Sequence, residues 1–147
     1  MTGRLTLIVD ASPLVAQAEP VHPFKQAARR FLLESASTLV VSPLVVAEVD
    51  HLMVARAGAG GSRPFMADLA RGRYVVPCLE TADFKSMADL NERYRDLNVG
   101  LTDLSIVVLA HRYNTRRVLT FDQRHFRLLR TLDGGSFTLL PFDEDDS

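Results

Sequence analysis

The chain has 147 residues, of which 47% are hydrophobic and 24% are charged, and its formal net charge is -1. This length fits one domain of ordinary size and excludes a second domain with a core of its own. The apolar runs are far shorter than the roughly 20 residues of a membrane span, and the N-terminus lacks the length and cleavage site of a secretory signal. We expect a single soluble domain in the cytoplasm, and the lone cysteine, Cys78, agrees with a reducing compartment.

Short apolar runs rich in branched residues predict strands, and apolar residues spaced three or four apart predict helices. In chain order, the sequence predicts a strand at 5–9, a helix at 24–33, a strand at 38–41, helices at 43–57 and 64–71, a strand at 74–77, helices at 81–94 and 103–111, and strands at 118–121 and 136–140. Strands that alternate with helices indicate a parallel sheet covered on both faces. We therefore predict an α/β fold of three layers, α/β/α, with four or five mainly parallel strands.

Helix boundaries carry recognisable signals. Ser12-Pro13 and Ser42-Pro43 each combine an N-cap residue with a proline suited to the first turn, and Thr102 is a candidate cap for the helix at 103–111. A glycine-rich loop at 58–62 ends the helix that contains Glu48. The last five residues, 143–147, are mostly acidic, so we predict a domain at 1–142 followed by a disordered tail.

Two aspartates come directly after predicted strands: Asp10 follows the first, and Asp122 follows the strand at 118–121. In open α/β sheets, ligands bind beyond the carboxyl ends of the strands. Each aspartate could instead cap a helix. That alternative is weaker for Asp10, because Ser12-Pro13 already provides a helix start, and it remains strong for Asp122.

Two further acids interrupt apolar helix faces. The neighbours of Glu48 one turn away include Leu44 and Leu52, and those of Asp103 include Ile106. Burial of an isolated carboxylate is costly, so a carboxylate on a core-facing stripe suggests a function. The alternative is that Glu48 lies at the solvent edge of its helix, and that Asp103 favours the positive N-terminus of its own.

If the four carboxylates converge, each close pair repels by on the order of 4 kcal/mol at an effective dielectric constant near 20. A cation or protonation must relieve this repulsion. No histidine or cysteine stands at matching spacing, so oxygen ligands favour Mg²⁺ or Mn²⁺ over zinc. Such ions activate water and stabilise the leaving oxygen of a phosphodiester, which predicts metal-assisted hydrolysis.

Four segments, taken in order, resemble the PIN-domain ribonucleases, and in particular the VapC-type toxins of toxin–antitoxin pairs. The segments are Leu7 to Ser12, Val46 to Val49, Leu101 to Ser105 and Leu119 to Phe126, and the resemblance covers nearly the whole chain. It implies that Asp10, Glu48, Asp103 and Asp122 form the catalytic metal site, with Asp10 and Asp103 as direct ligands. Ser12 and Thr120 match the small hydroxyl residues that accompany such sites, although a helix cap and an ordinary strand residue explain them equally well.

The resemblance also implies cleavage of RNA with Mg²⁺ or Mn²⁺, homodimerisation, and inhibition by a cognate VapB-type antitoxin. For RNA binding, arginines and histidines gather near the fourth acid: His111, Arg112, Arg116, Arg117, Arg124, His125, Arg127 and Arg130. Arg124 and Arg117 are the candidates for substrate contact, while a solvated arginine-rich surface is the alternative. For His125 we expect a half-buried side chain beside Phe126 rather than a general base.

Other functions compete with a nuclease. A haloacid-dehalogenase-like phosphatase needs a second aspartate two residues after the first, where this chain has Ser12. A receiver domain needs a lysine near its end, but the only lysines are Lys25 and Lys85. An RNA-binding or scaffold protein without catalysis would not need acids at all four positions.

Overall fold

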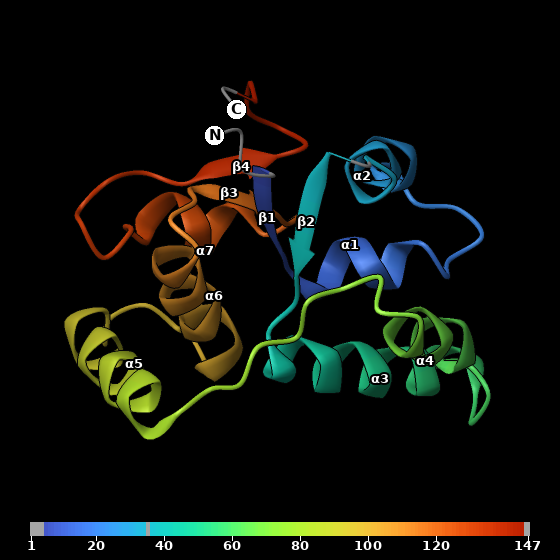
Figure 1. Ribbon diagram of the computed structural model, residues 1–147, viewed down its shortest axis with the longest axis horizontal. Coiled ribbons are helices and arrows are strands. Elements are labelled where there is room, and N and C mark those ends of the chain that lie inside the picture. Colours follow the sequence, from blue (N-terminus) through green and yellow to red (C-terminus); the bar gives the residue numbers. More distant parts are fainter. Residues whose placement is uncertain (1–4, 35, 146–147) are drawn as a thin grey trace.

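A parallel sheet of four strands forms the centre of the computed structural model, which describes residues 5–34 and 36–145 (Figure 1). The strands are β1 (Leu5–Val9), β2 (Ser37–Val40), β3 (Arg117–Leu119) and β4 (Thr138–Leu140), in the order β2-β1-β3-β4. Every neighbouring pair is parallel, and the register places Leu7 opposite Leu39 and Ile8 opposite Val118. The predicted α/β class with a parallel sheet is confirmed.

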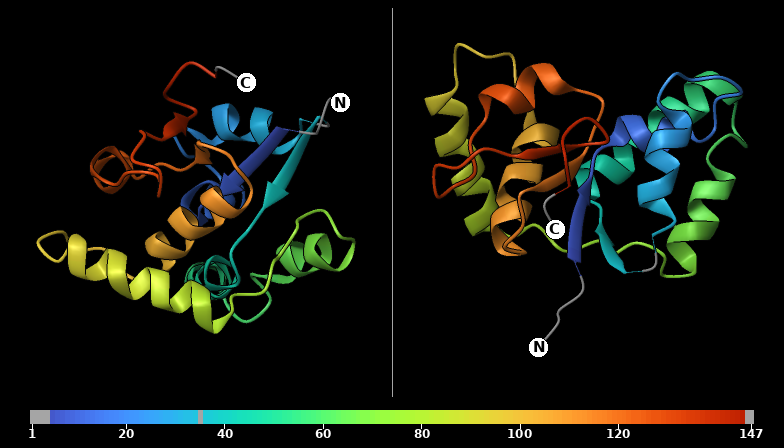
Figure 2. Two further views of the ribbon diagram at one scale, coloured as in Figure 1. Left: turned by 60° about the vertical axis from the view of Figure 1, so that its left-hand side comes forward. Right: turned by 90° about the horizontal axis from the view of Figure 1, so that it is seen from above.

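Helices connect the strands and build the outer layers. In chain order they are α1 (Ala11–Ala16), α2 (Lys25–Leu32), α3 (Pro43–Ala57), α4 (Arg63–Ala70), α5 (Thr81–Arg93), α6 (Leu101–Arg112) and α7 (Gln123–Leu128). Figure 2 shows α2 on one side of the sheet and α5 and α6 on the other. The short helix α7 was not predicted, because six residues with a single buried apolar position give too little periodicity.

The core lies on both faces of the sheet. Residues 7–9 of β1 and all of β3 are buried, and residues 7–9, 118 and 119 are apolar without alternation, as expected for strands covered on both faces. Helix α6 is buried from Leu104 to Ala110, so it is covered on all sides. Ser42 is the N-cap residue of α3, as predicted, and its hydroxyl accepts a hydrogen bond from the Leu44 amide.

The strand predicted at 74–77 is reduced to one bridge. Val75 pairs with Val40 in parallel orientation. The Val75 amide donates a hydrogen bond to the Leu39 carbonyl, and the Val75 carbonyl accepts one from the Val41 amide. Val75 and Val76 are about two-fifths exposed, and Pro77 has no amide hydrogen to continue a ladder. An exposed edge followed by proline therefore stops this segment after a single pair.

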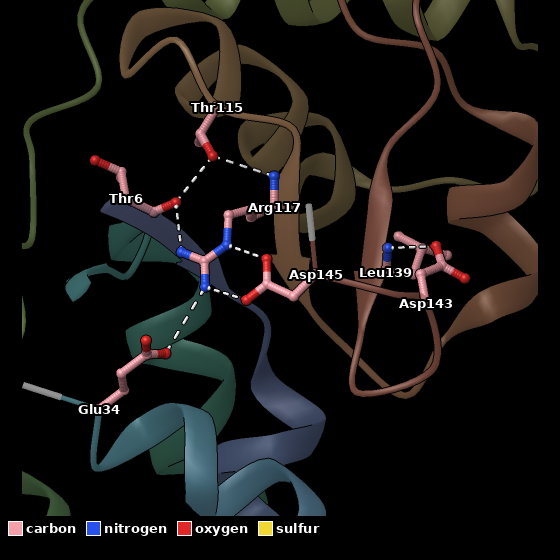
Figure 3. A network of polar contacts seen from close by, with 7 residues as sticks. All are labelled: Thr6, Glu34, Thr115, Arg117, Leu139, Asp143 and Asp145. Atoms are coloured by element: carbon pink, nitrogen blue, oxygen red, sulfur yellow. Dashed lines mark hydrogen bonds and ion pairs between the residues drawn. The ribbon is translucent and has the colours of Figure 1, made fainter. Parts of the chain in front are cut away.

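The structure describes residues 143–145 of the predicted tail, and two of their carboxylates have partners. Asp143 accepts two hydrogen bonds from Arg127 and one from the Leu139 amide. Asp145 accepts two from Arg117, at 2.8 and 2.9 Å, and Arg117 is only 8% exposed (Figure 3). Acidic residues were expected to stay solvated, but two arginines on β3 and α7 bind them; residues 146–147 lie outside the described part of the chain.

Deletion of residues 143–147 should lower the free energy of unfolding by about 2 to 3 kcal/mol, because hydrogen bonds to charged groups are lost. Among the described residues, buried Arg117 would then keep Glu34, at 3.8 Å, as its ion-pair partner. Urea denaturation measures this change. Glu144→Gln, a change at an exposed neighbour, is the control. An unchanged unfolding midpoint in the truncated chain would contradict the docked tail.

Within residues 5–34 and 36–145, none of the helices combines the length and the hydropathy that crossing a membrane requires.

Candidate active site

The four predicted acids line one cavity of about 480 Å³ beyond the carboxyl ends of β1 and β3. The cavity wall includes Asp10, Glu48, Asp103, Asp122 and His125. These residues come from the end of β1, from α3, from the first turn of α6 and from the start of α7. The structure thus brings together residues that are up to 115 positions apart in the sequence.

Asp10 caps helix α1, contrary to our expectation that Ser12 would do so. Its Oδ1 accepts a hydrogen bond of 2.8 Å from the Ala11 amide, and its own amide donates to the Leu119 carbonyl. The Ser12 hydroxyl instead accepts from the Phe121 amide at 3.1 Å. The serine–proline pair indicated a helix start at Ser12, but the helix begins two residues earlier, with Asp10 as its N-cap.

Thr120 connects the first acid to the fourth. Its hydroxyl donates to Asp10 Oδ2 at 2.7 Å and accepts from the Asp122 amide at 3.0 Å, and the side chain is completely buried. A strand threonine would not need both contacts, so the ordinary interpretation of Thr120 is inadequate. This residue orients the Asp10 carboxylate and fixes the turn that places Asp122.

The start of α6 places Asp103 in the cavity wall. Gly100, not Thr102 as predicted, is the N-cap residue of α6, and Asp103 lies in the first turn. The Ser105 hydroxyl is 2.7 Å from the buried Ser42 hydroxyl at the start of α3. This contact joins the helices that carry Asp103 and Glu48, and its residues were not recognised in the sequence as part of the site.

Glu48 is exposed, so the prediction that it interrupts a buried stripe is wrong. The buried positions of α3 are Val45, Val49 and Met53, and Glu48 lies beside this stripe at the solvent edge. Helix α3 is apolar enough overall that its polar and buried faces were hard to separate in the sequence. Although Glu48 is exposed, it still belongs to the site, because its side chain lines the cavity.

His125 lies between two of the acids. Its Nδ1 is 3.1 Å from Asp122 Oδ2 and 3.4 Å from Asp103 Oδ2. A ligand atom from each of these three residues lies within 4.8 Å of the others, a group that does not include Asp10 or Glu48. The side chain is half-buried as expected. Sequence spacing indicated no histidine as a ligand candidate, but His125 reaches Asp103 and Asp122 from the first turn of α7.

The cavity disfavours negative charge in the absence of a cation. The pKa of Asp10 is raised from 3.8 to about 7, chiefly by burial; hydrogen bonds from Thr120 and Ala11 oppose this shift, and the charges of Asp103 and Glu48 add to it. Burial also raises the pKa of Asp103, followed by the charge of Asp122, while His125 acts in the opposite direction. Carboxylates that resist ionisation where four of them meet are suited to a positively charged ligand.

The donor set fits a hard divalent cation. It consists of four carboxylates and one imidazole, and the most buried carboxylate has the most strongly raised pKa. Oxygen-rich sets of this kind suit Mg²⁺ and Mn²⁺, and an imidazole is compatible with Mn²⁺. The structure therefore contains a carboxylate cluster that is capable of metal binding.

Of the two arginines predicted to contact substrate, Arg117 is not at this site. It begins β3, at the opposite end of the strand from Asp122, and its guanidinium is bound by Asp145 and the Thr6 carbonyl (Figure 3). The sequence cluster grouped it with Arg124 because the two are close in the chain, but a strand separates them. Arg124 is exposed on α7 and stays a candidate.

The PIN domain family matches residues 7–131, which are most of the chain. The chain belongs to this family. Ribonuclease VapC26 of Mycobacterium tuberculosis is 38% identical to it over 135 residues, which are 92% of this chain and 100% of that protein.

Solved structures support the same fold. The Mycobacterium tuberculosis toxin VapC20, described as cleaving the sarcin-ricin loop, superimposes with a TM-score of 0.73 at 15% identity, over 80% of this chain and 91% of that one. VapBC2 of Rickettsia felis, solved with a fragment of promoter DNA, gives a TM-score of 0.66 at 17% identity, over 92% and 98%. FitAcB of Neisseria gonorrhoeae gives a TM-score of 0.59 at 16% identity, over 89% of this chain and 96% of that one.

Proposed function

We propose that the protein is a metal-dependent endoribonuclease that acts as the toxin of a toxin–antitoxin pair. The observation that carries this proposal is the single cavity lined by Asp10, Glu48, Asp103 and Asp122, in which burial and neighbouring charge raise the pKa of two acids. The relationship to Ribonuclease VapC26 supports RNA as the substrate.

Three of the four acids, Asp10, Asp103 and Asp122, have contacts that position their carboxylates. Thr120 and the Ala11 amide hold both oxygens of Asp10, so the orientation of this carboxylate is fixed before a ligand arrives. His125 Nδ1 lies 3.1 Å from an oxygen of Asp122 and 3.4 Å from one of Asp103, so the three side chains face the same point. Preorganised ligands of this kind avoid a reorganisation cost when a cation binds.

Mg²⁺ or Mn²⁺ bound by these carboxylates would lower the pKa of a water molecule and stabilise negative charge on the phosphodiester. We assign direct contact with the ion to Asp10 and Asp103, and we assign Glu48 and Asp122 to completing the site. The Asp122 side chain is 37% exposed and lines the cavity.

We also propose a VapB-type antitoxin as a protein partner, a homodimeric assembly and a cytoplasmic location. The support for the antitoxin is that a structurally similar protein was solved as the VapBC2 complex. Co-expression with the protein encoded beside it, followed by size-exclusion chromatography with light scattering, tests both assembly states.

Purified protein should cleave a mixed pool of structured RNAs with Mg²⁺ or Mn²⁺ and should not cleave it with a chelator, because the acids hold the activating ion. Gel analysis of end-labelled RNA measures cleavage and exposes the cut sites. Cleavage that persists in chelator contradicts the metal dependence. A folded protein that cuts nothing with either ion, in pools containing ribosomal, transfer and messenger RNA, contradicts the nuclease assignment.

A further inference from the structure

The negative charge of the cavity wall is unsuited to RNA unless a positively charged side chain of this wall binds a phosphate. Five carboxylates line the cavity, since Glu19 joins the four acids. Among the described residues of this wall, Arg56 is the one arginine, and there is no lysine. A protein that binds a polyanion needs arginine or lysine side chains, because their contacts to phosphates supply most of the affinity.

Arg56 lies on the same face of α3 as Glu48. Glu48, Leu52 and Arg56 are four residues apart, and all three line the cavity. Eight residues of helix correspond to about 12 Å at 1.5 Å per residue. Arg56 therefore lies about two helical turns from Glu48 along the wall of the same cavity, at a distance that suits a neighbouring phosphate better than the one next to the carboxylates.

The guanidinium of Arg56 is occupied by a weak partner. It forms an ion pair with Glu19, and the two side chains are 53% and 26% exposed. Ion pairs at this exposure stabilise a fold by little, so exchanging the partner has a small cost. A phosphate can replace the Glu19 carboxylate, because both present paired oxygens to the guanidinium fork.

We propose that Arg56 binds a backbone phosphate of the RNA next to the one that is cleaved, and that Glu19 competes with this phosphate. This inference rests on the proposed nuclease function and names a substrate contact that the family resemblance did not assign. It makes Arg56 a binding residue that acts on substrate affinity, whereas the carboxylates act on the chemical step.

Two variants should change binding in opposite directions. Arg56→Gln should raise KM and the dissociation constant for RNA roughly tenfold with kcat nearly unchanged, and it should reduce the slope of log K against log salt by about 0.7. Glu19→Gln should tighten binding severalfold, because Arg56 is freed. Arg71→Gln, which removes an arginine paired with Asp68 outside this cavity, is the matched control and should leave binding unchanged.

The double variant separates competition from simple charge. If Glu19 acts through Arg56, Glu19→Gln should tighten binding far less in the Arg56→Gln background than in the wild type. A gain that persists in full, or a KM unaffected by Arg56→Gln, would overturn the proposal. Thermal denaturation of each variant confirms that the fold is retained.

A neutral methylphosphonate placed at successive positions of the RNA locates the contact. One position flanking the cut should weaken binding to the wild type and have no additional effect in Arg56→Gln; equal effects in both proteins at every position would contradict the contact. Binding is measured by anisotropy of a labelled single-stranded RNA of mixed sequence. If the wild type cleaves no RNA, the nuclease assignment fails, and the anisotropy comparison still decides whether Arg56 binds phosphate.

Discussion

Asp103→Asn should reduce metal-dependent RNA cleavage by at least roughly a hundredfold while the protein stays folded, since metal catalysis contributes several kcal/mol to the reaction. The amide has nearly the shape of the carboxylate but carries no charge. Asp103 is only 18% exposed and faces both Asp122 and His125, so loss of its charge weakens the cation site directly. Single-turnover cleavage at saturating Mg²⁺ measures the rate.

The control for this variant is Asp89→Asn, an identical chemical change at an exposed position of α5 that does not line the cavity. It should cleave at the wild-type rate. Isothermal titration with Mn²⁺ adds a readout independent of activity, because Asp103→Asn should bind the ion more weakly. Full activity in Asp103→Asn would place the metal site elsewhere.

Asp10→Asn should stabilise the metal-free protein at pH 8 by on the order of 3 to 4 kcal/mol relative to the wild type, since the pKa of Asp10 rises from 3.8 to about 7 on folding. The buried carboxyl is readily accommodated when protonated. The folded wild type must ionise it at high pH in a place where burial and two neighbouring carboxylates oppose the charge. The asparagine has no such charge to bury, and its side-chain oxygen can still accept from the Ala11 amide.

The sign of the pH dependence follows from the raised pKa. The stabilisation by protonated Asp10 is complete below about pH 4 and is lost as the pH rises through about 7. The difference between wild type and Asp10→Asn should therefore be small near pH 4 and reach its maximum above pH 7. Urea denaturation in chelator across this range measures it, and parallel stability curves for the two proteins would contradict the raised pKa.

Adding Mn²⁺ should reverse this order at pH 8. A cation that binds the folded wild type stabilises it, whereas Asp10→Asn has lost a ligand and gains less. Thermal denaturation with and without the ion tests the reversal. Asp10→Asn should also be inactive. We therefore expect asparagine at position 10 to favour the stability of the metal-free protein, and aspartate to favour its activity with metal.

The sequence predicted all four strands of the sheet, together with a strand at 74–77 that is reduced to one bridge. β1, β3 and β4 each end in two or three consecutive apolar residues, a pattern typical of strands buried on both faces, and this pattern indicated a parallel sheet. The acids that follow β1 and β3 could then be placed at the carboxyl edge. Family resemblance added Glu48 and Asp103, whose helices gave an ambiguous signal.

Contacts across the sheet could not be predicted in the same way. Whether Thr120 meets Asp10, or His125 meets Asp103, depends on which strands are neighbours, and no local pattern contains that information. Arg117 illustrates the reverse error, since closeness in the chain to Asp122 suggested closeness in space. The ion pair between Arg117 and Asp145 joins residues 28 positions apart, so a tail that resembles a disordered segment in composition is held by a partner far upstream.

The position of β3 between β1 and β4 has a consequence for biosynthesis. Asp10 is made early, but the carbonyl that receives its amide belongs to Leu119, and the hydroxyl that orients its carboxylate belongs to Thr120. A nascent chain that has reached the end of α6 has three of the four acids and lacks the strand that aligns the first of them. The proposed hydrolytic centre therefore cannot assemble before Leu119 and Thr120 have been synthesised, and we expect a chain that stops at the end of α6 not to cleave RNA.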